Sequence, residues 1–191
     1  SVSETPTLAL VGKEKVSGPY VEWLTDSFAA GASNKVEQGN SSSAVAITAG
    51  SRYSNRTQIS EKTFSITGTQ EVAEKAGDQS EEDYQIAKKM VELKKDIEFG
   101  FLQNTTAIAA AAGTAPQSRG LLGFIATNTS KGASGVDPAP LTNTAPTDGT
   151  QRAFTETLLK DALKLMFDNG APMDNLYALV PSAQRTTFDG F

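Results

Sequence analysis

The sequence feature that most constrains the fold is a long helical pattern over residues 78–104. Apolar side chains recur there three or four positions apart, which is the spacing of one helix face. They are Ile86, Met90, Leu93, Ile97 and Phe101. Asp78 is a suitable capping residue at the start. At 1.5 Å per residue the helix is roughly 40 Å long. Because an average helix has only about 11 to 12 residues, we expect this one to form an axis along which other elements pack.

The opposite face of this helix is charged. Lys88 and Glu92 stand four positions apart, as do Lys94 and Glu98, and pairs at this spacing favour a solvent-exposed face. The apolar stripe is then predicted to face the chain's own strands and its second helix.

Residues 1–76 are predicted to be rich in β structure, and most of them belong to one long arm. Residues 20–25 mix aromatic and β-branched side chains as strands do. Residues 57–69 alternate apolar and polar side chains, with Phe64 and Ile66 on one face. Between these segments, residues 31–54 are rich in Gly, Ser, Asn and Ala. The simplest arrangement is a two-stranded arm whose tip lies in this stretch.

An arm of this kind is only marginally stable alone, because it has no second layer to cover its apolar face. Residues 31–54 also hold too few large apolar side chains to offset an ordering cost of about 1 to 2 kcal/mol per residue. We therefore expect this stretch to protrude and to be ordered mainly by contacts with a neighbouring subunit.

The second half of the chain combines helix, strand and long loops. Residues 121–125 are a compact apolar run that we expect to be buried, and a second helix is predicted over 153–167. A strand is predicted over 176–180, with a turn or helix beginning at Pro181. The sequence has no internal repeat, so the expected fold class is α+β. Because the chain closes soon after the last predicted strand, we expect a fragment trimmed at both ends.

The missing residue types exclude most catalytic and metal sites. The chain has no Cys and no His, and therefore neither thiolate nor imidazole chemistry. The acidic residues 81–83 are explained by the helix dipole, and the glycines form no phosphate-binding loop. We predict no catalytic residue, no metal and no cofactor. A net charge of −5, from 17 basic and 22 acidic residues, disfavours nucleic-acid binding as the main function. No apolar run approaches the roughly 20 residues of a membrane span.

Several short motifs resemble those of the major capsid proteins of tailed phages. In that family a Trp-centred strand and an Asn-x-Thr-Gln strand flank an extended loop, and the matching residues here include Trp23, Asn55 and Gln58. The matches follow the family's order and cover most of the chain. They lie at residues 22–26, 55–59, 67–69, 92–98, 119–125 with Asn128, and 179–182.

The resemblance implies the Hong Kong 97-like capsid fold in an incomplete form, with partial peripheral and axial domains. By this analogy residues 1–18 are a remnant of the N-terminal arm region, and residues 19–76 are the extended loop with its supporting strands. Residues 77–118 are the long spine helix and the segment after it, and residues 119–191 are the beginning of the axial domain.

The resemblance also implies a structural subunit without enzymatic activity, which self-assembles into the icosahedral head shell of a tailed phage or prophage. Its partners would be other copies of itself in hexamers and pentamers, together with portal and scaffolding proteins and, non-specifically, packaged DNA. It would have no membrane partner, would assemble in the bacterial cytoplasm and would reside in the virion.

Six residues are predicted to carry assembly and structure: Trp23, Asn55, Gln58, Lys88, Glu92 and Lys95. Two alternative functions remain at this point. The Ser/Thr/Gly-rich loops and the acidic charge suit a secreted or surface adhesin module, and a hydrolase could work with carboxylates alone. The long charged helix favours the capsid subunit over the adhesin, because surface β modules rarely contain one.

Overall fold

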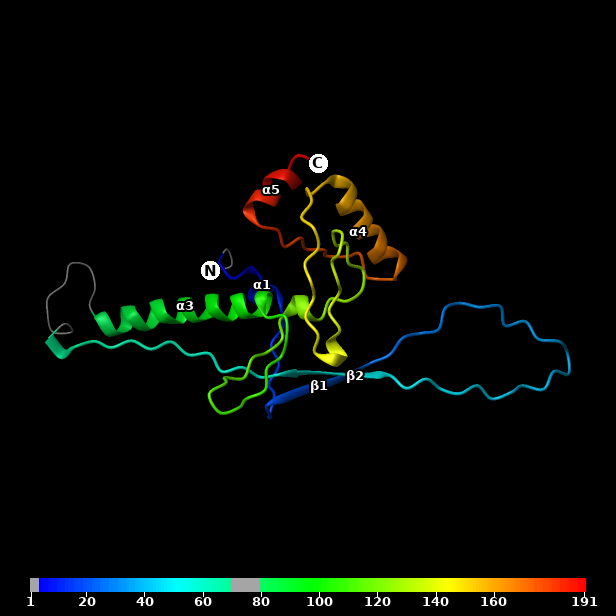
Figure 1. The fold of residues 1–191 in the computed structure, drawn as a ribbon, viewed down its shortest axis with the longest axis horizontal. Helices are drawn as coiled ribbons and strands as arrows, with labels where there is room; N and C mark the ends of the chain where they lie inside the picture. Colours follow the sequence, from blue (N-terminus) through cyan, green and yellow to red (C-terminus); the bar gives the residue numbers. More distant parts are fainter. Residues whose placement is uncertain (1–3, 70–79) are drawn as a thin grey trace.

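The computed structural model describes residues 4–69 and 80–191 and combines a long helix, a two-stranded ladder and several short helices (Figure 1). This mixture of helix and strand confirms the α+β class. The elements in chain order are α1 (Pro6–Leu10), β1 (Tyr20–Thr25), β2 (Ser51–Arg56), α3 (Glu81–Gln103), η1 (Leu121–Gly123), η2 (Pro140–Thr142), α4 (Glu156–Asp168) and α5 (Ser182–Phe188).

Helix α3 confirms the long helix that the sequence predicts. The Ser80 hydroxyl accepts a hydrogen bond from the amide of Asp83, so Ser80 is the N-cap, while the predicted cap Asp78 lies outside the described residues. Three acidic residues follow in the first turn, where the helix dipole favours them. The helix ends at Gln103, and its C-cap residue Asn104 has an extended backbone that takes the chain out of the helix.

The arm is an antiparallel ladder with an open loop at its end. Strand β1 pairs with β2 in a register that sets Trp23 opposite Tyr53. Residues 26–50 form no strand, are exposed throughout and extend far beyond the ladder (Figure 1). The predicted protrusion is thus confirmed for most of residues 31–54, although the last four belong to β2. Whether a neighbouring subunit orders this loop stays a prediction.

Residues 57–67 do not form the predicted strand. Strand β1 offers six residues, and these are already paired with β2, so the chain beyond Arg56 has no partner for a ladder. It runs instead along α3, where the Lys62 ammonium lies 2.6 Å from the Asp96 carboxylate. The alternating pattern therefore reflects contact with a helix on one side and solvent on the other.

The charged face of α3 was assigned wrongly at Glu98. Glu98 is only 6% exposed, and its two carboxylate oxygens accept hydrogen bonds from the amides of Thr7 and Leu8, each at 2.8 Å. The backbone amides of Thr7 and Leu8, in the first turn of α1, thus hold this helix on α3. Met90, Leu93 and Ile97 line a groove beside Leu8 of α1, so α1 lies against part of the apolar stripe and leaves Met90 exposed, and the expected strands and second helix do not line this groove.

The second half agrees with the sequence in its helices and differs in its strand. Helix α4 matches the predicted second helix, with the Thr155 hydroxyl as cap, and α5 begins directly after Pro181. Residues 176–180 form no strand, because no neighbouring strand is present within the described residues to pair with them. Residues 121–125 contain a single 3-10 turn, and Leu122 is 51% exposed, so the prediction that this run is buried is wrong.

Burial is the most unusual property of the fold. Within residues 4–69 and 80–191 Pro138 is the one apolar side chain that is buried, and the chain exposes 15210 Å², where a compact protein of 20.1 kDa exposes about 8,700 Å². None of the helices in these residues is long and apolar enough to cross a membrane.

Candidate functional site at the root of the arm

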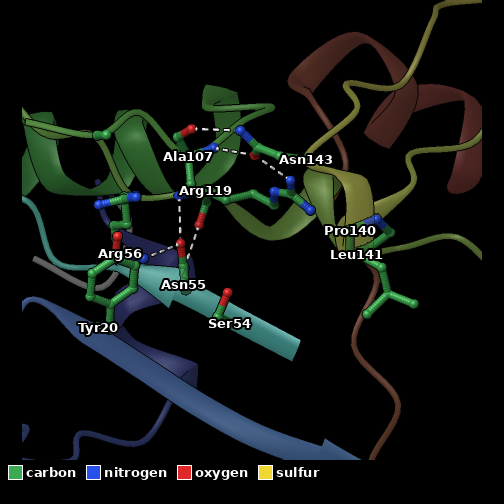
Figure 2. A pocket seen from close by; sticks show the side chains of 10 residues that line it. Tyr20, Ser54, Asn55, Arg56, Ala107, Arg119, Pro140, Leu141 and Asn143 are labelled. Atoms are coloured by element: carbon green, nitrogen blue, oxygen red, sulfur yellow. Dashed lines mark hydrogen bonds between the residues drawn. The ribbon is translucent and has the colours of Figure 1, made fainter. Parts of the chain in front are cut away.

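A pair of hydrogen bonds joins the end of β2 to the segment after α3. The side-chain amide of Asn55 donates to the carbonyl of Arg119 at 2.9 Å, and the Asn55 side-chain oxygen accepts from the Arg119 amide at 2.8 Å (Figure 2). Asn55 therefore pairs with a main chain as another strand would. We call the surrounding cluster the root junction and define it by Asn55, Gln58, Asn104, Arg119 and Asn143.

A second set of contacts holds the chain where it leaves the ladder. The Gln58 side-chain oxygen accepts from the amide of Ser118 and from the side chain of Asn104, each at 3.2 Å. Asn104, the C-cap residue of α3, also donates to the carbonyl of Ser118 at 3.0 Å. The arm, the end of α3 and the loop after it thus share one hydrogen-bond network.

Arg119 is the buried centre of the root junction. It is 4% exposed, and its guanidinium donates to the carbonyl of Gly123 at 3.4 Å and to the side-chain oxygen of Asn143. No carboxylate pairs with it among the described residues, its Nε atom has no hydrogen-bond partner there, and burial lowers the pKa of its guanidinium. Asn143 in turn exchanges two hydrogen bonds with the backbone of Ala107, at 2.9 and 2.8 Å.

Two glycines allow this close approach of backbones. A Cβ on Gly120 would lie 2.3 Å from the carbonyl oxygen of Phe101, and one on Gly123 would lie 2.6 Å from that of Thr105. Both distances are shorter than real contacts permit, so only glycine fits at these positions. The motif Arg-Gly-Leu-Leu-Gly is therefore the local sequence that fits the chain against the end of α3.

Trp23 lies beside the root junction on β1. Its ring stacks on that of Tyr53, with centroids 6.2 Å apart, and contacts Phe124 at 5.5 Å. It is still 38% exposed, more than an anchor in a core would be. The ring thus bridges the ladder and the loop after α3 while leaving much of its surface uncovered.

Lys88, Glu92 and Lys95, the other predicted assembly residues, lie together on α3, apart from the root junction. They line a shallow surface with Tyr84 and Val91. Glu92 pairs with Lys89 at 2.7 Å, and Lys95 pairs with Glu4 at 2.9 Å. The Lys89 ammonium also holds the pKa of the Glu92 carboxyl below its usual value. A role for these three residues in assembly stays a prediction.

Sequence reasoning identified two of the five root-junction residues as site residues. Asn55 and Gln58 came from the motif resemblance, whereas Arg119 was noted only within its motif, and Asn104 and Asn143 were not singled out for this role. Asn143 has a φ of 54°, a left-handed conformation that asparagine tolerates better than most residues, but a sequence alone does not reveal it.

The root junction is suited to holding backbones together and has no machinery for a reaction. Its members are amides, a guanidinium and main-chain groups, none of which is a nucleophile or a base at neutral pH. Within the part of the chain that the structure describes, no three acidic side chains gather as a metal site.

The comparisons with known proteins agree with a structural role. No curated protein matches the chain. A family model described as SU10 major capsid protein matches residues 1–191, the entire sequence given. The resemblance noted in the motifs is thereby confirmed at the level of the family. The chain belongs to the SU10 major capsid protein family, and its role is that of a structural subunit of a phage capsid, built with other copies of itself.

Proposed function

We propose that the chain builds an icosahedral head shell as a Hong Kong 97-like subunit. In this proposal residues 19–76 are the extended loop with its supporting strands, α3 is the spine helix, and residues 119–191 begin the axial domain. Supporting this assignment are the protruding arm, the long helix beside which its returning chain runs, and the root junction that joins them.

The observation that carries the proposal is the uncovered apolar surface. The chain exposes 15210 Å², roughly 6,500 Å² more than a compact chain of its mass. Large apolar side chains are exposed all along it, among them Phe28 and Ile47 in the arm and Met90 and Phe99 on α3. Monomeric proteins rarely expose so much apolar area, and interfaces between copies would cover it.

The partners in this proposal are first of all other copies, arranged in hexamers and pentamers. Portal and scaffolding proteins are further partners, packaged DNA is contacted only non-specifically, and assembly takes place in the bacterial cytoplasm before the subunit resides in the virion. The subunit has no catalytic step in this scheme. The family assignment favours this structural role over the surface adhesin and over the hydrolase that uses carboxylates alone.

The test is assembly of the purified full-length protein. We expect closed shells in electron micrographs and a sedimenting species far larger than the subunit, with rings of five and six copies on the shell surface. A reconstruction of the shell would show whether α3 and the arm occupy the spine and extended-loop positions. A protein that stays monomeric with or without scaffolding protein, or a shell of another subunit fold, would contradict the proposal.

A further inference from the structure

A pocket at the root of the arm is positively charged and has no acidic residue in its lining. Figure 2 shows it between the end of β2, the loop after α3 and the 3-10 turn at Pro140. Arg56 and Arg119 both line it, together with Ser54 and Asn55. The hydrogen-bonding atoms of Asn55 are already used by the root junction, so the two guanidinium groups dominate the chemistry of the pocket.

The two arginines have no carboxylate partner among the described residues. Arg119 is buried with its Nε atom unpaired, and Arg56 lies 4.3 Å above the ring centroid of Tyr20, a contact that positions its guanidinium without neutralising it. The nearest acid in the ladder is Glu22, directly opposite Ser54, but its carboxylate pairs with Arg52 at 3.9 Å. A buried cation without a partner is costly, so the pocket is electrostatically incomplete in a single chain.

The tip of the arm carries a carboxylate that could complement the pocket, Glu37, two residues after the basic Lys35. The amide of Asn40 donates to the carbonyl of Glu37 at 3.1 Å, which closes a tight turn, and Gly39 supplies the positive φ of 87° that the turn requires. Glu37 is exposed, and no partner of its carboxylate is found in the described part of the chain. The other acid of the loop, Asp26, lies at its base and already accepts from the amide of Ser27.

The tip of the arm lies far from the root of its own arm in this structure, because residues 26–50 extend away from the ladder. Glu37 stands twelve residues beyond the end of β1, up to about 40 Å along an extended chain. Figure 1 shows the loop extending straight away from the ladder. With the arm in this extended conformation, a contact between the two joins different copies, and a contact between two different patches of identical chains forms a ring where the rotation between copies closes.

We propose that Glu37 at the arm tip of one copy inserts its carboxylate into the pocket of Arg56 and Arg119 of the next copy. The inference rests on the proposed function, since it needs neighbouring copies. Arg56 donates directly to the carboxylate, Ser54 offers a hydroxyl beside it, and the buried charge of Arg119 strengthens the attraction. A protein carboxylate suits the site better than a nucleic-acid phosphate, because the chain carries a net charge of −5.

Charge reversal in the full-length protein tests the contact. We expect Arg56→Glu to reduce the yield of shells at least tenfold while the circular dichroism of the subunit stays unchanged. The double variant Arg56→Glu with Glu37→Arg should restore most of the yield, because the two reversed charges then attract each other between copies. Normal shells from Arg56→Glu, or no restoration by the second change, would overturn the proposal.

Disulfide trapping gives an independent readout, because the chain has no cysteine of its own. Shells of Glu37→Cys with Arg56→Cys, treated with a mild oxidant, should yield a ladder of linked subunits on a non-reducing gel. The matched control combines Glu37→Cys with Arg52→Cys, on the same strand but outside the pocket, and should stay largely monomeric. Shells that form and yet give no ladder, or an equal ladder from the control, contradict the tip-to-root contact without affecting the proposed function.

Discussion

Asn55 and the backbone of Arg119, which are far apart in sequence, exchange two hydrogen bonds, of 2.9 and 2.8 Å. An amide side chain that pairs with a main chain in this way replaces a strand where the ladder has ended. The Asn55 side chain thus fixes the arm to the loop after α3, together with the contact of Gln58 with Ser118 and that of Trp23 with Phe124. Any force on the arm from a neighbouring copy acts on this connection.

The first prediction concerns Asn55→Asp. The change keeps one acceptor but replaces the donor to the Arg119 carbonyl by a second oxygen, so a hydrogen bond becomes a repulsion. We expect a loss of about 1 to 3 kcal/mol in the free energy of unfolding, measured by urea denaturation. Asn40→Asp at the exposed arm tip is the control and should change little. Equal effects at both positions would show that the Asn55 contact contributes nothing.

The second prediction concerns Gly120→Ala. The added Cβ would lie 2.3 Å from the carbonyl oxygen of Phe101 and 2.9 Å from that of Asn104, and both are backbone atoms that cannot move alone. We expect a destabilisation of at least about 1 to 3 kcal/mol and faster proteolysis of the segment after α3. Gly31→Ala, where a Cβ meets open space, should have no measurable effect. A stable Gly120→Ala subunit would mean that the chain passes farther from α3.

The third prediction concerns the pH dependence of the contact between α1 and α3. Burial raises the pKa of the Glu98 carboxyl, but its hydrogen bonds with Thr7 and Leu8 outweigh burial and hold the pKa below the ordinary value of about 4.3. The contact is therefore fully present above that ordinary value and is lost as the pH falls below it toward the folded-state pKa.

Limited proteolysis of residues 4–10 measures this loss. We expect protection of the wild-type segment to be constant from pH 7 to about pH 5 and to fall below about pH 4. Glu98→Gln keeps the shape of the side chain without its charge, so its protection should be weaker at neutral pH and should change less over the same range, where the ion pair of Glu4 with Lys95 still titrates. A wild-type profile parallel to that of Glu98→Gln would assign the pH effect to another group.

Sequence reasoning succeeded where the signal was local and failed where it depended on a partner. Helix α3 and helix α4 follow from periodicity and caps, and β1 was predicted with its observed bounds. The strands at residues 57–69 and 176–180 were wrong, because an alternating or apolar run forms a strand only if another strand is within reach. Glu98 was placed in solvent because nothing in its local sequence reveals that α1 returns to it.

The same distinction applies to the root junction. Asn55 and Gln58 were found because they lie in a motif. The side chains of Asn104 and Asn143 reach the root junction only because the fold brings their backbones there, and no local sequence pattern reveals this. The two glycines of the Arg119 motif matter for packing, because the backbone of Phe101 approaches Gly120 too closely for any larger residue.

The fourth prediction concerns Trp23, which contacts Tyr53 and Phe124 and yet stays 38% exposed. Trp23→Ala should destabilise the isolated subunit by about 1 to 3 kcal/mol, less than the 3 to 5 kcal/mol typical of a fully buried aromatic side chain. Trp23→Phe keeps one ring contact and should lose less. Thermal unfolding followed by circular dichroism measures both, and a loss of 4 kcal/mol or more for the alanine variant would indicate burial that the fold does not show.

The last prediction concerns the exposed face of α3 around Lys88. Lys88 is exposed and its ammonium has no ion-pair partner in the described residues, so Lys88→Glu should leave the circular dichroism and thermal unfolding of the subunit unchanged. If this face contacts a neighbouring copy, the same change is repeated at every equivalent interface of the shell and should reduce the yield of sedimenting particles strongly. Lys160→Glu on α4 reverses a similarly exposed charge away from this face and should assemble normally. Leu93→Asp provides the opposite case, because it places a charge in the groove between α1 and α3 and should weaken folding before assembly begins. Normal shells from Lys88→Glu would place this face of α3 outside the interfaces.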